Sequence, residues 1–231
     1  MALTRETLVS EQLQQMVRQA PELLPYLLST AELQASIAQT LSQKPNQGDV
    51  WIFAYGSLIW NPILHYGDRR PSKIYGWHRR FCMRTPIGRG TPEQQGLVLA
   101  LERGGSCRGV AYRVAAEHVS TELLLLWKRE MLVGSYIPRW VKLLTEMTES
   151  EPKSETESKP EAMTAIAFTI NPRHPLYAPR LSVTEVAATI AIARGSLGSC
   201  ADYLHATITG LAECGIIDRH LLSVRDRLER F

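Results

Sequence analysis

The stretch that decides the fold is Val50-Trp51-Ile52-Phe53-Ala54-Tyr55-Gly56-Ser57-Leu58. Residues 50–54 are apolar and rich in β-formers, which predicts a short strand buried on both faces. A Gly beside a Ser directly after such a strand lets the backbone turn sharply and expose N–H groups, which suit a carboxylate or an oxyanion. An ordinary turn at a strand end has the same composition, so the interpretation depends on the rest of the chain.

Outward from this strand, Gly and Pro clusters separate further short segments with strand character. We expect strands at 73–83, 97–101, 107–114, near 137–146 and at 162–170. Such tight spacing favours an antiparallel meander or barrel over βαβ units. Helical patterns predict a helix at 116–132 and three more at 182–194, 199–214 and 218–230. Ser182 and Asp218 fit N-caps, and Gly195 and Gly215 fit C-terminal stops.

Two segments stand apart from this domain, which we place at residues 46–231. Residues 1–45 read as a helical extension packed on the domain, and Pro21 and Pro25 divide it into at least two helices. Residues 149–161 contain five Glu and no apolar residue. A segment of this composition has nothing to bury, so we expect a mobile acidic loop inserted in a hairpin.

Composition excludes several classes of protein. The chain has 231 residues, of which 45% are hydrophobic and 21% charged, as in an ordinary globular protein. A net charge of +3 is too weak to indicate a nucleic-acid or membrane partner, and no apolar run approaches a membrane span. The six His and four Cys form no metal-binding motif, so we expect no metal site. A soluble cytoplasmic protein with thiols at Cys82, Cys107, Cys200 and Cys214 is the expectation.

Glu130 is the candidate for acid–base chemistry. It continues an apolar helical stripe, at i+3 from Trp127 and i+4 from Leu126. A carboxylate there either ends the stripe in water, pairs structurally with an Arg, or is desolvated with a raised pKa. We expect Lys128 and Arg129 to point elsewhere on the helix and to leave Glu130 without an intrahelical partner.

Two other arrangements carry less weight. Alternation along Trp77-His78-Arg79-Arg80-Phe81 places Arg79 between two aromatic residues, where it could meet an acidic substrate, although satisfied sheet residues are the simpler interpretation. Ser57 with His65 and Asp68 could suggest a serine hydrolase. The chain lacks the G-x-S-x-G nucleophile turn that the serine hydrolase hypothesis requires.

Taken in order, several motifs resemble the ChaC-type γ-glutamylcyclotransferases. The resemblance covers about residues 50 to 230 and rests on 50–60, Gly76-Trp77-His78-Arg79-Arg80-Phe81, Arg89-Gly90-Thr91-Pro92, Gly109-Val110-Ala111-Tyr112-Arg113 and Trp127-Lys128-Arg129-Glu130-Met131. It implies an α+β fold, a mixed and partly closed β-barrel with surrounding helices. Ala54 departs from the family, since many members have Gly there. The family's glycine pair after the catalytic helix is replaced by Val133-Gly134-Ser135-Tyr136.

The resemblance also implies a reaction and its residues. The α-amine of a γ-glutamyl group attacks its own γ-carbonyl, 5-oxoproline closes, and for glutathione Cys-Gly leaves, with no metal, cofactor or protein nucleophile required. Glu130 is then the acid–base catalyst. The substrate-binding residues are Ile52, Phe53, Ala54, Tyr55, Gly56 and Ser57, with Tyr136 as a pocket wall. We expect the apolar setting of Glu130 to raise its pKa, because an ordinary Glu is a weak base for an amine.

Two alternatives remain open at this stage. The same chemistry could act on other γ-glutamyl amines or peptides, or the chain could be a non-catalytic regulator of cation transport, an association that the family name carries. The sequence does not indicate which residues form the leaving-group side of the pocket. It also does not indicate the oligomeric state or the role of residues 1–45.

Overall fold

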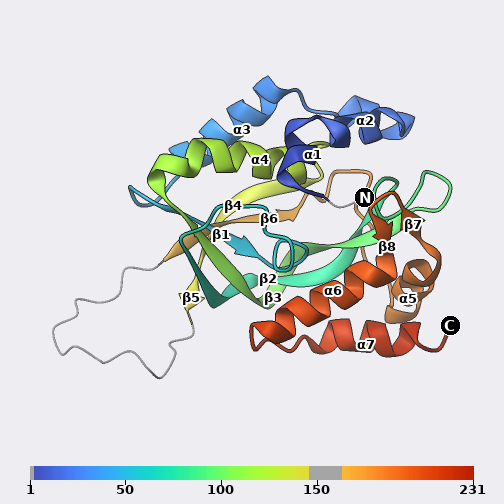
Figure 1. Ribbon diagram of the computed structural model, residues 1–231. Coiled ribbons are helices and arrows are strands. Elements are labelled where there is room, and N and C mark those ends of the chain that lie inside the picture. The colour runs from blue at the N-terminus through green and yellow to red at the C-terminus, as the bar shows by residue number, and fades with distance from the viewer. Residues whose placement is uncertain (1–2, 146–162) are drawn as a thin grey trace.

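The computed structural model describes residues 3–145 and 163–231, built around one mixed six-stranded sheet. The strand order is β4-β6-β1-β3-β2-β5, and Figure 1 shows the sheet curling between two groups of helices. The strands are β1 Val50–Ala54, β2 Asp68–Thr85, β3 Gly96–Val114, β4 Tyr136–Lys142, β5 Leu144–Thr145 and β6 Thr164–Ile170. This confirms the α+β fold with a mixed sheet. The acidic segment 149–161 lies outside the described residues.

Strand β1 lies in the middle of the sheet, which explains its apolar sequence. It pairs antiparallel with β3, from Val50↔Val114 to Ala54↔Val110, and parallel with β6. Beyond the end of β1, β6 pairs directly with β3 at Leu101↔Thr169. The chain that follows β1 therefore leaves the sheet where its two neighbours close together.

Strands β2 and β3 form a long antiparallel pair. The prediction of separate strands at 97–101 and 107–114 is wrong, because β3 runs through the intervening glycines without a break. Gly104 and Gly105 have φ of 106° and 65°, a conformation open to glycine, and they lie opposite a register shift between Tyr75 and Trp77. The glycines thus produce a local irregularity within one continuous strand and do not end it.

The N-terminal helices and α4 cover one side of the sheet (Figure 1). They are α1 Arg5–Val9, α2 Gln12–Arg18, the 3₁₀ helix η1 Pro21–Tyr26, α3 Thr30–Ser42, the 3₁₀ turn η2 Ala116–His118 and α4 Val119–Glu130. Pro21 begins η1 and Pro25 lies inside it, in agreement with the predicted break. The Trp127 indole N–H donates to Ser36 Oγ at 3.0 Å, which joins α4 to α3.

Three C-terminal helices lie on the other side of the sheet, α5 Val183–Ile192, α6 Cys200–Glu213 and α7 Arg219–Leu228. Ser182 and Asp218 are N-caps as predicted, and Gly215 follows α6 with φ of 68°. Gly195 is not a helix stop. It belongs to a small hairpin, β7 Arg194–Gly195 with β8 Gly198–Ser199, and a Cβ there would meet the Gly88 carbonyl oxygen at 2.4 Å.

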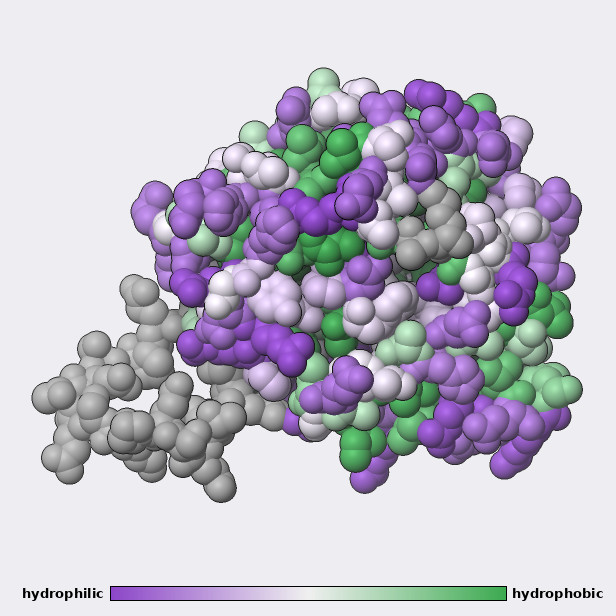
Figure 2. Space-filling view, viewed as in Figure 1, coloured by the Kyte–Doolittle hydropathy of each residue, from purple (hydrophilic) through white to green (hydrophobic). Residues whose placement is uncertain are grey.

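One continuous apolar core joins the sheet to both helical layers. Cys82, Cys107 and Cys200 are buried in it as free thiols, and Cys214 is partly exposed. Figure 2 shows a face on which hydrophobic side chains are scattered in small groups among hydrophilic ones. In the parts of the chain that the structure describes, no helix is both long enough and apolar enough to cross a bilayer.

Candidate active site

The loop after β1 and the C-terminal end of α4 meet in a small enclosed pocket. Its volume is about 20 Å³, and it is lined by Tyr55, Gly56, Ser57, Leu58, Leu99, Glu130, Tyr136, Phe168 and Tyr203. The predicted residues Tyr55, Gly56, Ser57, Glu130 and Tyr136 are thus brought together. Four of the lining residues also line a larger cavity of about 430 Å³, namely Ser57, Glu130, Tyr136 and Tyr203. The pocket is therefore the inner end of a substrate-sized space.

The other three predicted binding residues lie behind this loop. Ile52, Phe53 and Ala54 are fully buried in β1 and line neither cavity. The Ala54 carbonyl oxygen is so close to β3 that a Cβ on Gly109 would meet it at 2.3 Å. In the structure, these three residues form the end of β1, from which the loop emerges.

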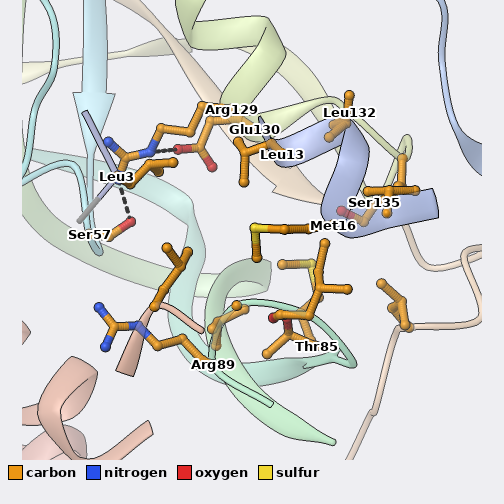
Figure 3. A pocket seen from close by; sticks show the side chains of 18 of the residues that line it. Leu3, Leu13, Met16, Ser57, Thr85, Arg89, Arg129, Glu130, Leu132 and Ser135 are labelled. Atoms are coloured by element: carbon orange, nitrogen blue, oxygen red, sulfur yellow. Dashed lines mark hydrogen bonds and ion pairs between the residues drawn. The ribbon is translucent and has the colours of Figure 1, made fainter. Parts of the chain in front are cut away.

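Arg129 is the main correction to the sequence analysis. It does not point away from Glu130, because its Nε lies 3.0 Å from Glu130 Oε1. The same guanidinium donates to Ser57 Oγ at 2.8 Å (Figure 3). It also donates to the Asn61 carbonyl oxygen at 2.6 Å. α4 ends at Glu130, and the long Arg129 side chain turns back toward the loop that follows β1. Arg129 therefore fixes Glu130 relative to that loop.

The environment of Glu130 raises the pKa of its carboxyl, as expected. Burial is the main cause, since desolvation disfavours the charged form, and the Arg129 charge and hydrogen bond oppose it. The side chain is 14% exposed, at the wall of the cavity. A carboxyl with this balance can take up and release a proton closer to neutral pH than an exposed Glu.

Two tyrosine hydroxyls anchor the pocket to the sheet. Tyr55 donates to the Phe168 carbonyl oxygen at 2.7 Å, and Tyr136 donates to the Leu99 carbonyl oxygen at 3.0 Å. Burial raises the pKa of both phenols well above its ordinary value. Both are therefore neutral groups that fix the shape of the pocket.

Gly56 sits at the tightest point of the loop. A Cβ there would lie 3.0 Å from the Tyr203 hydroxyl oxygen and 3.7 Å from Leu99 Cβ. Within the described part of the chain, the backbone N–H groups of Gly56 and Ser57 donate to no protein acceptor. These two N–H groups are donors of the kind that an oxyanion requires.

Several residues that line the cavity were not predicted from the sequence. Tyr203 comes from α6, and Arg89 follows the β2 strand; nothing in their local sequence placed them beside Glu130. The extension contributes an apolar wall of Leu3, Leu13, Met16, Val17 and Leu23. Figure 3 shows Arg129 and Glu130 on one side of this cavity and Arg89 on the other, with Met16 at the centre of the view.

The weaker candidates have structural partners elsewhere. His65 Nδ1 lies 3.5 Å from Glu122 Oε1, and the ring is mostly exposed, so it forms no dyad with Ser57. Arg79 is buried and bonded to Asp218 and to the carbonyl oxygens of Tyr55 and Arg108. In residues 3–145 and 163–231, no group of three His, Cys, Asp or Glu side chains is placed to hold a metal ion.

Comparison with known proteins places this site in a family. The model of the ChaC-like protein family matches residues 50–230, which contain the loop, Glu130 and Tyr203. The chain belongs to the ChaC-like family. Residues 1–49, which contain all five residues of the apolar wall from the extension, precede the part that the ChaC-like family model matches.

Relatives of this ChaC-like chain include proteins named for one activity. It is 42% identical over 192 residues to the glutathione-specific gamma-glutamylcyclotransferase of Escherichia coli, covering 83% of this chain and 78% of that protein. It is 32% identical to glutathione-specific gamma-glutamylcyclotransferase 1 of the mouse, covering 80% and 82%. A crystal structure of the yeast gamma-glutamyl cyclotransferase specific to glutathione matches 80% of this chain and 97% of that one. Its TM-score is 0.68 at 22% identity, which shows the shared fold.

Proposed function

We propose that this protein is a γ-glutamylcyclotransferase that cleaves glutathione to 5-oxoproline and Cys-Gly. The observation that carries the proposal is the meeting of a partly buried Glu130 with the N–H groups of Gly56 and Ser57, which have no acceptor among the described residues, at the inner end of the cavity. The names of the E. coli and mouse relatives support glutathione as the substrate.

The protein's first task is to fold the γ-glutamyl group so that its α-amine faces its own γ-carbonyl. Tyr55, Tyr136 and Tyr203 line the inner pocket beside Glu130 and bound the space in which the γ-glutamyl group must fold. Because the two reacting groups belong to one molecule, orientation replaces a bimolecular encounter and lowers the barrier.

Glu130 moves the protons. Its carboxylate takes a proton from the α-ammonium, and the freed amine forms the new C–N bond at the γ-carbonyl. The C–N bond to the cysteine nitrogen then breaks as Glu130 returns the proton to that nitrogen. The attacking nitrogen gives up its second proton by the same route, so a neutral lactam remains and Cys-Gly leaves as its ammonium. One carboxyl serves both steps because it ends each turnover in its starting state.

Backbone donors stabilise the intermediate. The tetrahedral carbon carries a negative oxygen, and the N–H groups of Gly56 and Ser57 can donate to it. The Ser57 hydroxyl is not a nucleophile in this scheme. It accepts a hydrogen bond from the Arg129 cation, which lowers the reactivity of its oxygen.

The test is release of 5-oxoproline from glutathione by wild type, Glu130→Gln and the exposed control Glu117→Gln. Glu130→Gln keeps the size of the side chain and removes proton transfer, so turnover should fall about 10²- to 10⁴-fold. Glu117→Gln should match wild type. Turnover retained in Glu130→Gln would contradict its role. No release by wild type would contradict glutathione as substrate, and a panel of γ-glutamyl amines and dipeptides would then test the wider class.

A further inference from the structure

Arg89 occupies the cavity wall that faces the proposed catalytic group. Its backbone is fixed by neighbours on both sides: its N–H donates to the Ile87 carbonyl oxygen at 2.8 Å, and its carbonyl oxygen accepts from Cys200 Sγ at 3.2 Å. Gly90, which follows it, is packed so closely that a Cβ would meet the Gly96 nitrogen at 2.3 Å. The segment therefore holds the start of the Arg89 side chain in one place.

Protein groups use only part of the hydrogen-bonding capacity of the Arg89 guanidinium. It donates to the Ser199 carbonyl oxygen at 3.2 Å, and its Cζ lies 5.8 Å and 5.9 Å from the ring centroids of Trp60 and Tyr203. Across the described ranges, it forms no ion pair with a carboxylate. Asp202, whose charge also acts on it, is committed to the N-terminus of α6, where its carboxylate accepts from the Ser199 N–H at 3.1 Å.

A partly buried Arg without a carboxylate partner is costly, which indicates a ligand anion. Burial lowers the pKa of the Arg89 guanidinium, because the charged form loses water. Arg also presents a planar set of donors that fits a carboxylate in a bidentate geometry. Two other arginines line this cavity. Arg129, at its inner end, is already occupied by Glu130, Ser57 and Asn61, and Arg84 is exposed, so its charge keeps its water.

The position of Arg89 beside Tyr203 suits the far end of the substrate. Two residues of extended chain reach at most about 7 Å, which is the span of Cys-Gly beyond the γ-carbonyl. Arg89 lies over the ring of Tyr203, and Tyr203 itself lines the inner pocket beside Glu130. We propose that Arg89 binds the terminal carboxylate of the leaving dipeptide and so determines the choice of leaving group. This inference rests on the function proposed above.

The experiment compares glutathione with its glycine ethyl ester, which lacks that carboxylate, in wild type and Arg89→Gln. For glutathione, kcat/KM should fall about 10- to 100-fold, the effect of losing hydrogen bonds to a charged group. The loss should be in KM, because this carboxylate is remote from the reacting bond. For the ester, wild type and Arg89→Gln should agree within about threefold. The matched control is Arg173→Gln, an exposed arginine outside the cavity lining.

Equal losses on the two substrates would overturn the inference, because Arg89 would then act on the γ-glutamyl carboxylate or on the fold. Calorimetric binding of both compounds to Glu130→Gln, with and without Arg89→Gln, gives a second measurement that needs no turnover. Glutathione binding weakened about tenfold or more by Arg89→Gln, with ester binding unchanged, supports the inference even if wild type releases no 5-oxoproline. Turnover by wild type with no Arg89-dependent difference between the compounds leaves the proposed function standing and removes the inference.

Discussion

The first prediction concerns the ion pair that ties the N-terminal extension to α4. Arg5 Nη1 lies 2.6 Å from Glu122 Oε2, and Arg5 Nη2 lies 2.9 Å from Glu122 Oε1, so the two side chains form a bidentate pair. Arg5 also donates to the Ile63 carbonyl oxygen at 2.7 Å, and Glu122 accepts from the His65 backbone N–H at 3.0 Å. Arg5→Met keeps the apolar stem of the side chain and removes the guanidinium.

The size of the effect follows from burial. The Glu122 side chain is 3% exposed. Without Arg5 it becomes a buried carboxylate whose remaining partner among the described residues is His65. Removing one partner of a fully buried pair costs about 3 to 5 kcal/mol. Because Arg5 is 29% exposed, water screens part of the interaction, and we expect a loss of about 2 to 3 kcal/mol. For a chain of this size, that lowers Tm by about 4 to 12 °C.

Thermal unfolding followed by circular dichroism at pH 7.5 measures the effect. Arg225→Met is the control, since Arg225 pairs with Asp226 at the surface and should leave Tm within error of wild type. The double variant Arg5→Met with Glu122→Gln should recover part of the loss, because no unpaired charge is then buried. A single variant as stable as wild type, or a double variant showing the sum of the two single losses, would refute the reasoning.

The pH dependence of the Tm difference between wild type and Arg5→Met follows from the pKa of Glu122. Burial acts to raise the pKa of Glu122, but the hydrogen bonds from Arg5 and His65 outweigh it, so the pKa lies below its ordinary value of 4.5. A lowered pKa contributes stability that is present above the ordinary value and is lost as pH falls through the lowered one. In Arg5→Met, the contribution of Arg5 is lost while that of His65 remains, so burial weighs more and the Glu122 carboxyl takes up a proton at higher pH. The Tm gap should therefore be widest at pH 7 to 8 and narrow on acidification. A gap independent of pH would contradict this account.

Two further predictions concern the site itself. Burial raises the pKa of Glu130, and its carboxylate must accept a proton. The acidic limb of the kcat/KM profile against pH should therefore lie above 4.5 and should be absent in Glu130→Gln. A limb at or below 4.5 in wild type would contradict this prediction. Gly56→Ala places a Cβ 3.0 Å from the Tyr203 hydroxyl oxygen, so steady-state assays should show about a 10- to 100-fold loss of kcat/KM from misplacement of the loop. Adding Tyr203→Phe, which removes that oxygen, should restore part of the activity, and no restoration would place the cause elsewhere.

Prediction from the sequence succeeded where neighbours along the chain decide the structure. The apolar run of β1 and the caps at Ser182 and Asp218 are local features, and the structure contains them. It failed at Gly104, where a glycine pair looked like a strand end. Pairing with the whole length of β2 supplies hydrogen bonds on both sides of those glycines, and this outweighs their weak preference for a strand.

For the candidate site, turn chemistry and helical periodicity are properties of short segments, and they marked the loop at Gly56 and the carboxyl of Glu130 as candidates among alternatives. The resemblance to the ChaC-type family was needed to assign them a role. Only the tertiary structure decided what surrounds them. Arg129 turns back to bind Glu130 because the loop after β1 offers it two oxygen acceptors. Tyr203 and Arg89 reach the cavity from distant segments, and such neighbours are set by how the sheet curls and which helices pack on it, not by spacing along the chain.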